Sequence, residues 1–526
     1  MKLSDRLTAY AKEYRGVFLM GALFAAIVHL YFFTNTLPNY DTLVTQYSYN
    51  MGLSLGRWTN SLGSILSSAY ALPWVTGVIC FAFLGLLCVV LCDVLEVRTK
   101  AGRAAVCALA VSFPTLAASY SFLFIADSLT IGIFLAALSV KLVKDTRFGF
   151  LTGGALLGVS IGFYQSHISY AMLLCVIVYA LQLLGRRFTS AKEALRQAGR
   201  YALLIVTGFT LYYIGFRLCL LVTGYQLPDS YQDIQALTGG FSFDPGASLA
   251  RVFAECTACI GGGIPFLSAL RVPLLLLTAL SALICGLTLA VRNRVYKDPL
   301  SCVLLVLLLL AVPVSLAATS FISTNVGYHA VMRTPWMLLF VGAVAVAERA
   351  FAPLPPSADA PSSPSKPPKG RRCLRAATLA VAFLTAWNFL LVSNMGYLNM
   401  QQRYERDYAV MIRVADRLEQ TEGFTGAEPL LCTGYYSAYA PVNLFARDQA
   451  ALDALAGMNA ETMLVYPHVY NEFLRYYLGV NLPYPCDATV SDILASDAYA
   501  AMGEFPAASS VGQIDGVFVV KLSGVG

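Results

Sequence analysis

Long apolar runs recur along this chain and limit the folds that it can adopt. Stretches of about 17 to 25 apolar residues, enough to cross a hydrocarbon core roughly 30 Å thick, recur from residue 17 to residue 394. The runs are continuous and do not alternate with period two, so they predict helices and not the strands of a barrel. With 57% hydrophobic and 13% charged residues, the chain is not an ordinary globular enzyme, in which about a quarter of the residues are charged.

The sequence therefore predicts an all-α polytopic membrane protein with about eleven spanning helices. The segment "YFFTNTLPNY" after the first run has no small-x-small cleavage site, so we expect this run to remain as an uncleaved anchor. The expected spans lie near residues 17–34, 70–92, 104–120, 127–143, 148–163, 168–184, 200–223, 271–291, 299–319, 331–349 and 376–394.

Basic residues gather in alternate loops, which predicts the orientation of the chain. The positive-inside rule makes these loops and the N-terminus cytoplasmic. The net charge of +6 reflects this asymmetry, and no basic stripe with interleaved aromatic residues indicates a nucleic-acid partner. The basic residues concerned are Lys2, Arg6, Lys12, Arg15, Arg98, Lys100, Arg103, Lys144, Arg147, Arg186, Arg187, Lys192, Arg196, Arg200, Arg292, Arg294, Lys297, Lys366, Lys369, Arg371, Arg372 and Arg375.

Composition divides the chain into four parts. Residues 1–350 form the predicted catalytic bundle with its outer loops, 351–375 a cytoplasmic linker rich in Pro and Ser, and 376–394 the last span. We expect residues 395–526 to form a small extracytoplasmic α/β domain. It would begin with the amphipathic helix "QQRYERDYAVMIRVADRLEQ" and contain strands at "EPLLCTG" and "GVFVVKL" and helices at "QAALDALAGM" and "NEFLRYYLGV".

Most of the thirteen cysteines lie inside the expected spans, where a thiol acts as a small apolar group. Cys256 with Cys259, and Cys432 with Cys486, lie on the outer side. Either pair could form a disulfide there, and the spacing of the cysteines does not decide whether one forms.

The loop after the first span, "NYDTLVTQYSYNMGLSLGRW", carries one acid and one base. Its apolar residues predict a short helix lying in the outer interface. Asp41 at the start of this helix is either an N-cap or a catalytic base with a pKa raised by partial burial. Arg57 either pairs with Asp41 or with lipid headgroups, or binds a phosphate through its fork of donors.

A second polar cluster belongs to the segments "YSFLFIADSLTIG" and "GFYQSHISY". Asp127 begins the fourth span, where a carboxylate is costly unless it caps the helix, is paired or is functional. Tyr164, Gln165 and His167 occupy a very short outer turn and offer hydrogen-bond partners for sugar hydroxyls. The plainer interpretation of His167 is an interfacial histidine, and that of Tyr164 an aromatic belt residue.

The third cluster, "STNVGYHAVMRTPWMLLF", brings His329 and Arg333 into the tenth span from outside. An idle arginine at a helix mouth is expensive, so we expect a phosphate or a carboxylate partner for Arg333, with Asp127 as the structural alternative. Arg217 is the one formal charge well within a span, where its side chain either snorkels or meets the same partner.

The sequence contains no Walker loop, Rossmann fingerprint, paired-histidine metal helix or nucleophile elbow. A sugar transferase that works on the outer side must therefore use a donor that a lipid already carries. A lipid-oligosaccharide flippase or transporter is the alternative from another class, although such proteins place ionisable groups near the bilayer midplane. A polysaccharide polymerase or ligase shares the topology.

At "NYD", "GRW", "YSFLFIADSLTIG" and "SIGFYQSHISY" the sequence resembles the bacterial glucosyltransferase family of the GtrII type, a branch of the integral-membrane GT-C glycosyltransferases. The resemblance covers roughly the first 400 residues. It implies inverting transfer of a hexose, typically glucose, from a polyprenyl-phosphate sugar to a cell-surface polysaccharide or similar acceptor.

The resemblance also implies roles for individual residues. Asp41 maps onto the catalytic base in the first outer loop, and Asp127 onto the position of a second acid, which in some members helps to bind a divalent metal such as Mg or Mn. Arg57 and Arg333 become candidates for the donor phosphate. The first loop has a single acid where many GT-C proteins have two, so the resemblance does not establish a metal cofactor.

Overall fold

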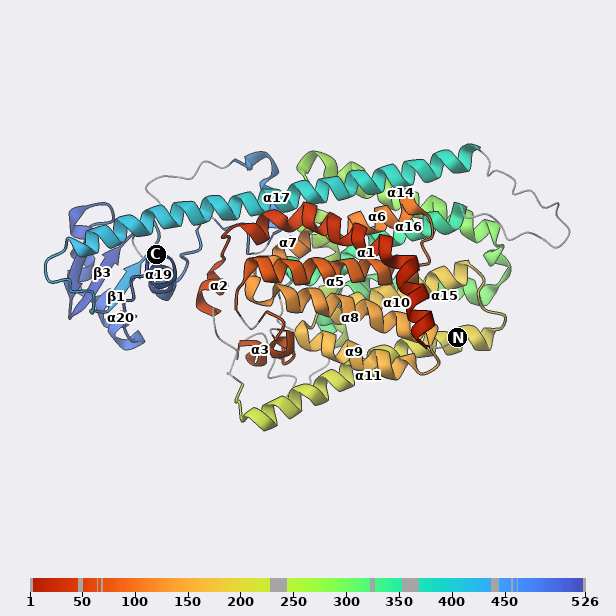
Figure 1. Cartoon of the computed structure of the whole chain (residues 1–526), viewed down its shortest axis with the longest axis horizontal. Helices are drawn as coiled ribbons and strands as arrows, with labels where there is room; N and C mark the ends of the chain where they lie inside the picture. Colours follow the sequence, from red (N-terminus) through yellow and green to blue (C-terminus); the bar gives the residue numbers. More distant parts are fainter. Residues whose placement is uncertain are drawn as a thin grey trace.

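About three quarters of the described residues are helical, and most of the helices form one elongated bundle (Figure 1). The computed structural model describes residues 3–45, 51–63, 65–67, 70–227, 244–321, 327–351, 369–436, 444–455, 457–460 and 462–523. Residues 352–368, most of the predicted linker, lie outside these ranges.

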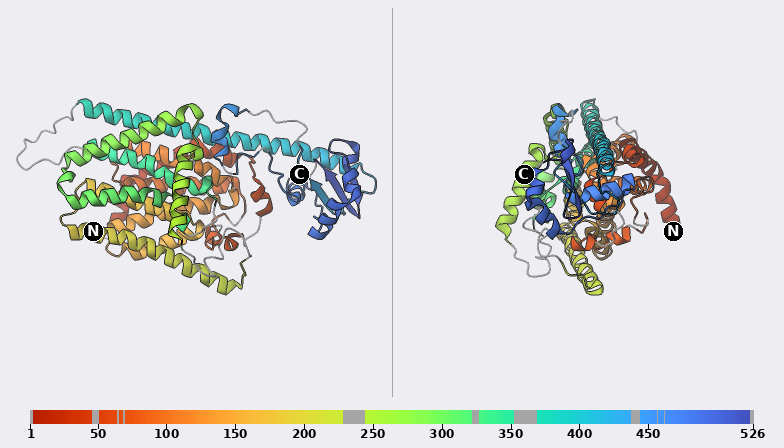
Figure 2. Two further views of the ribbon diagram at one scale, coloured as in Figure 1. Left: turned by 180° about the vertical axis from the view of Figure 1, so that it is seen from behind. Right: turned by 90° about the vertical axis from the view of Figure 1, so that its left-hand side faces the viewer.

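Within the described ranges, nine helical segments are long and apolar enough to cross a membrane. The prediction of a multispanning helical protein is confirmed, whereas the count of eleven is not. These segments contain α1 (Leu3–Thr34), α5 (Pro73–Val94), α8 (Ala126–Asp145), α10 (His167–Leu184), α11 (Ala191–Thr223), α14 (Ser268–Arg292), α15 (Pro299–Leu316), α16 (Met337–Phe351) and α17 (Lys369–Glu419). Helices α1, α5 and α8 face the viewer in Figure 1, and α14 and α15 come forward when the molecule is seen from behind (Figure 2).

The span expected at 104–120 is a bent pair of helices. α6 (Lys100–Ser112) and α7 (Pro114–Tyr120) meet at an angle of 41°. Phe113 between them has a non-helical ψ of 122°, because a proline excludes the helical conformation from the residue before it. The bend at Pro114 therefore follows from local sequence.

The span expected at 148–163 is the short helix α9 (Gly149–Phe163), which packs closely on α11. A side chain added at Gly208 of α11 would lie 2.7 Å from Leu157, and one added at Gly158 would lie 3.1 Å from the carbonyl of Gly208. Small residues let helix backbones approach in this way within a membrane. At 15 residues α9 is about 22 Å long, shorter than the hydrocarbon core, so the turn after it lies inside the bundle.

The last span and the amphipathic helix that was expected to follow it are one continuous helix. α17 has 51 residues and is therefore about 77 Å long, more than twice the thickness of the hydrocarbon core. Its far end carries the remaining C-terminal elements away from the bundle (Figure 1).

These elements, with the far half of α17, form a C-terminal domain around a three-stranded sheet of order β1-β3-β2. β1 (Leu430–Thr433) pairs in parallel with β3 (Val517–Lys521), and β2 (Val511–Ile514) pairs antiparallel with β3. β1 and β3 lie within "EPLLCTG" and "GVFVVKL". Short helices complete the domain: α19 (Pro467–Phe473), α20 (Asp487–Ala495) and α21 (Asp497–Ala501). α18 (Gln449–Asp453) packs instead on the bundle, whose core includes Ala451 and Leu452.

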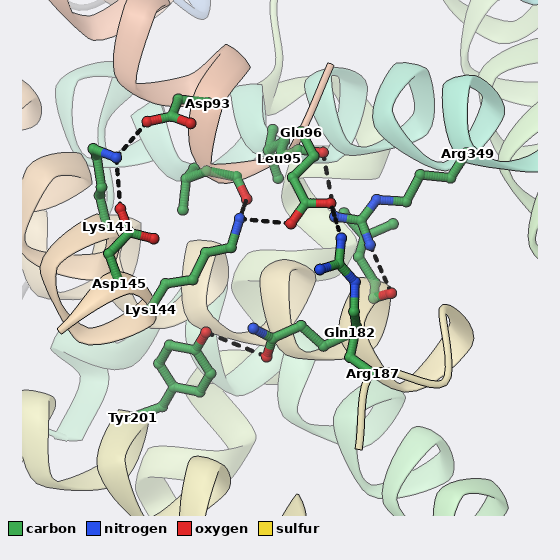
Figure 3. Close-up of polar contacts among 12 residues, drawn as sticks. Asp93, Leu95, Glu96, Lys141, Lys144, Asp145, Gln182, Arg187, Tyr201 and Arg349 are labelled. Carbon is green, nitrogen blue, oxygen red and sulfur yellow. Dashed lines mark hydrogen bonds and ion pairs between the residues drawn. The ribbon is translucent and has the colours of Figure 1, made fainter. Parts of the chain in front are cut away.

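Charged side chains from several helices form a network at the end of the bundle where α1 begins, which we call the basic end (Figure 3). Glu96, just after α5, pairs with Lys144 at 2.9 Å and Arg349 at 3.4 Å, and also with Arg187. Lys141 bridges Asp93 and Asp145 beside it. Basic residues of separate loops thus meet at one end of the bundle, where carboxylates fix the helix ends relative to one another.

We predict that Glu96→Gln lowers the stability of the bundle by about 1 to 3 kcal/mol. A fully buried pair costs about 3 to 5 kcal/mol when one partner is removed, and Glu96 keeps 20% of its side chain exposed. Thermal unfolding in detergent should show a lower midpoint for Glu96→Gln than for the exposed control Glu422→Gln. Equal midpoints would contradict the prediction.

Candidate active site

The helix that carries Asp41 is capped by another residue. α2 (Tyr40–Thr45) follows Asn39, whose Oδ1 accepts hydrogen bonds from the backbone N–H of Thr42 at 2.8 Å and from its hydroxyl at 2.9 Å. This is the N-cap pattern. The interpretation of Asp41 as an N-cap is therefore wrong, because the helix starts one residue before Asp41. Of the interfacial helix expected after it, residues 46–50 with Tyr47 lie outside the described ranges.

α2 lies between the bundle and the C-terminal domain (Figure 1). Leu43 is fully buried in a hydrophobic cluster with Met411 and Val414 of α17 and Tyr470 of α19. The ring of Tyr40 meets that of Tyr466 edge-on, with the centroids 6.0 Å apart. The C-terminal domain thus fixes one face of the helix that carries Asp41.

A buried arginine of α17 joins α2 to a returning segment of the C-terminal domain. Arg403 donates to the carbonyl of Pro38, just before α2, at 3.1 Å and to the carbonyl of Gly457 at 3.3 Å. Leu455 and Met458 of that segment belong to the core of the bundle. The C-terminal domain therefore contacts the bundle at two separate places.

Arg57 projects from a turn that several buried groups hold in place. Gln165 donates to the carbonyl of Leu55 at 2.6 Å, and the hydroxyl of Tyr212 donates to the carbonyl of Gly56 at 3.1 Å. The guanidinium lies over the ring of Tyr164, 4.6 Å from its centroid, in a cation–π contact. Gln165, which was expected to bind sugar hydroxyls, uses its amide N–H to position this turn.

The positive charge of Arg57 acts on the titratable groups around it. Burial raises the pKa of the Asp41 carboxyl above its ordinary value, and Arg57 opposes that rise. Burial, together with the charges of Arg57 and Arg333, lowers the pKa of His329 to about 4, so His329 is neutral near pH 7. Nε2 of His329 lies 3.5 Å from the hydroxyl of Tyr164. Arg57, Tyr164 and His329 therefore form one cluster, and the charge of Arg57 also reaches Asp41.

Two nitrogens of this cluster are buried without a hydrogen-bond partner among the described residues: Nε of Arg57, which is a donor, and Nδ1 of His329, which is a donor when the imidazole proton lies on it. A buried polar group without a partner costs roughly 1 to 3 kcal/mol, so each would gain from an oxygen-rich ligand. Orphaned guanidinium nitrogens also occur elsewhere, for example Nε of Arg349 at the basic end, so the cluster is defined by its combination of groups.

The side chain of His167 is buried between helices and is not at the surface of the bundle. Its Nδ1–H donates to the carbonyl of Ser160 at 2.8 Å, and its ring fills the space left by Gly132 of α8. These are packing contacts between helices, so a role for His167 in binding sugar stays a prediction.

Asp127 lies in the first turn of α8 and is not its N-cap, since Ile125 takes that position. Its Oδ1 accepts from the backbone N–H of Ser128 at 2.7 Å. Among the described side chains no group of three or more His, Cys, Asp and Glu residues is placed to bind a metal ion. Asp127 therefore belongs to no such group in the part of the chain that the structure describes.

Arg333 has a resident carboxylate partner that the sequence did not indicate. Its Nε and Nη2 donate to the two oxygens of Glu255 on α13 (Pro245–Ala258), at 2.6 and 3.0 Å. Pairing of Arg333 with Asp127 is therefore wrong. This fork leaves Arg57 as the better candidate for an incoming phosphate, because the charge of Arg333 is already balanced.

The structure also bears on the predicted cysteine pairs and on Arg217. Cys256, Cys259, Cys432 and Cys486 are all free thiols, so neither open pairing is a disulfide in this structure. Arg217 is exposed on the outside of α11 near its end, where a long side chain can snorkel to the interface.

We predict that Leu43→Ala loosens α2. Truncation of a buried leucine costs about 2 to 5 kcal/mol of stability. If this loss destabilises only the docking of α2, the population of locally opened α2 rises at least about 30-fold. Hydrogen–deuterium exchange of residues 40–45 should accelerate by this factor. The matched control is Val44→Ala, because Val44 is 40% exposed on the same helix. Unchanged exchange in Leu43→Ala would show that the C-terminal domain does not restrain α2.

Comparison with known proteins gives one match. The family model described as Glucosyl transferase GtrII matches residues 30–343, about three fifths of the chain. No curated protein and no solved structure matches. The matched region contains the whole cluster around Arg57 and ends within α16, before α17 and the C-terminal domain. The chain therefore belongs to the GtrII glucosyltransferase family and is a membrane glycosyltransferase.

Proposed function

We propose that the chain transfers a hexose, glucose in keeping with the family, from a polyprenyl-phosphate donor to a glycan acceptor on the outer face of the bacterial inner membrane. The observation that carries this proposal is a half-buried carboxylate, Asp41, within reach of the charge of Arg57, at the end of the bundle opposite the basic end. The positive-inside rule makes the basic end cytoplasmic, so the cluster faces outward. The proposal includes membership of the GT-C class.

A lipid-borne donor fits this location. The sequence has no nucleotide-binding motif, and a polyprenyl phosphate would place its phosphate at the membrane surface with its chain in the hydrocarbon. Arg57 would bind the phosphate, and His329, neutral near pH 7, would donate one N–H to it. The orphaned Nε and Nδ1 of these residues supply the donors.

The proposed reaction is a single displacement at the anomeric carbon. The acceptor hydroxyl oxygen forms the new bond to that carbon, its proton passes to Asp41, and the bond between the carbon and the phosphate oxygen breaks. Polyprenyl phosphate leaves with the bonding electron pair, and Arg57 stabilises its charge. The configuration at the anomeric carbon inverts. Partial burial raises the pKa of Asp41, which makes it a stronger base. Asp127 remains a proposed second acid behind the cluster, with no metal in the mechanism.

The competing classes differ in product. A flippase or transporter would use charges near the bilayer midplane, whereas the charged cluster lies at the outer end. A polymerase or ligase would add a chain. Chemical analysis of surface glycans with and without the gene should reveal loss of a single side-branch hexose; accumulated unexported lipid-linked precursor would instead indicate a flippase.

We predict that Asp41→Asn reduces transfer from a lipid-phosphate sugar by about 10²- to 10⁴-fold, the usual contribution of a general base. The variant should fold normally, because Asn39 and not Asp41 caps α2. Transfer of labelled hexose in membranes measures the effect, with the exposed Asp492→Asn as the control. Normal transfer by a folded Asp41→Asn protein would rule out this assignment.

We also predict a characteristic pH dependence. A base must be deprotonated, so the rate should fall as the pH drops through the raised pKa of Asp41, above the ordinary aspartate value of about 3.9. Arg57→Gln removes the charge that lowers this pKa. It should move the acid limb of the kcat/KM profile to higher pH, in addition to a loss of about 10²- to 10³-fold in rate.

Profiles from about pH 4 to 8 for wild type, Arg57→Gln and the exposed control Arg475→Gln test this dependence. An acid limb at the same pH in wild type and Arg57→Gln would mean that Arg57 does not act on the catalytic base.

A further inference from the structure

Four aromatic rings form a row that starts next to Asp41 and continues over the C-terminal domain. Tyr40 precedes Asp41 on α2, and its ring is 6.0 Å from that of Tyr466. Tyr466 is stacked with His468, with centroids 5.8 Å apart and an interplanar angle of 6°, and His468 meets Tyr484 edge-on at 6.2 Å. We call these four residues the aromatic row.

The aromatic row is more exposed than packing alone requires. Tyr466 is 52% exposed and its neighbour Val465 45%, and His468 is also exposed, while Tyr40 and Tyr484 are half-buried. Exposed apolar side chains on a soluble surface are normally scattered singly. A continuous series of them that ends at a candidate catalytic carboxylate indicates a binding surface.

The charge of the surrounding domain limits what can bind there. Residues 420–526 contain eleven acidic and only three basic residues. Such a surface repels anionic lipid headgroups and polyanions such as nucleic acids. A ligand for the aromatic row must therefore carry little negative charge, be long enough to reach Asp41, and be able to pack on ring faces.

A glycan chain has this chemistry. The C–H groups on one face of a pyranose ring form an apolar patch with positive edges, which packs on the negative face of an aromatic ring, while the hydroxyls around its rim remain in water. A tyrosine adds a hydroxyl that bonds to the same rim.

We propose that the aromatic row binds the acceptor glycan and guides its reactive hydroxyl to Asp41. This inference rests on the proposed function, since it assigns the acceptor side of the same site. It also gives the C-terminal domain, which lies outside the family match, a direct part in substrate recognition. The donor enters from the membrane and the acceptor from the C-terminal domain, so the two substrates meet at α2.

The test uses the full-length protein in detergent and two exposed or half-exposed positions of the row, Tyr466→Ala and Tyr484→Ala. The probe is surface polysaccharide purified from cells that lack the gene, which therefore lacks the added hexose. Tyr435→Ala is the matched control, because Tyr435 is 57% exposed on the same domain and lies outside the aromatic row.

The expected result is an apparent KM for the polysaccharide about tenfold higher in Tyr466→Ala and Tyr484→Ala, with kcat at saturating acceptor and KM for the lipid donor unchanged. Tyr466→Trp should restore the KM, since any aromatic face can stack. Either of two results would overturn the proposal: an unchanged acceptor KM, or a lower kcat at unchanged KM, which would show that Tyr466 acts only by packing α2.

A second measurement separates this proposal from the reaction itself. Binding of the same polysaccharide to Asp41→Asn protein, measured by calorimetry without donor, should weaken about tenfold when Tyr466→Ala is added. Weaker binding supports the aromatic row even if no transfer is detected, a result that would count against the proposed function alone. Equal binding in the two proteins refutes the aromatic row even if transfer depends on Asp41.

Discussion

Hydrocarbon offers no hydrogen-bond partners, and this constraint determines where the chemistry of the protein can lie. Every backbone group within the membrane must be satisfied inside a helix, so the spans are continuous apolar helices and the charged side chains gather at their two ends. At the basic end the carboxylate of Glu96 is surrounded by cations and the charges balance. At the other end Arg57 keeps a buried N–H without an acceptor. The first end is held together by carboxylates that pair with several cations. The second end instead places an arginine beside a neutral histidine and a half-buried aspartate, the groups that the proposed transfer uses.

The C-terminal domain contributes to that second end although it lies outside the family match. Leu43 and Tyr40 of α2 pack against it, and Arg403 of α17 bonds to the carbonyl before α2. Asp41 thus sits on an element bounded by the bundle on one side and by the domain on the other. The charged groups lie within residues 30–343, which match the family model. The rest of the chain packs against α2, which carries Asp41.

Sequence reasoning predicted a multispanning helical protein, because apolar length is a local signal, and it proposed Asp41 and Arg57 as site residues from their isolated charges. It missed features that depend on long-range contacts. Glu255 and Arg333 are 78 residues apart, and nothing in either segment indicates their pairing. The role of Gln165 in positioning the turn before Arg57 depends on a contact across 110 residues. The sequence prediction placed the start of α2 at Asp41, whereas the helix begins one residue earlier and is capped by Asn39. A difference of one residue is within the ordinary error of predicted helix boundaries.

The packing of Leu43 also has a consequence for biosynthesis. α2 is made among the first residues of the chain, whereas its partners in α17 and α19 follow about 370 or more residues later. At about 10 residues per second, roughly half a minute passes before the partners of Leu43 exist. During that time the membrane segments already insert one after another, yet the aspartate helix has no surface to dock on. A truncated or still nascent chain thus holds its spans in the bilayer while α2 lacks the partners of Leu43, and translation of the C-terminal domain supplies them.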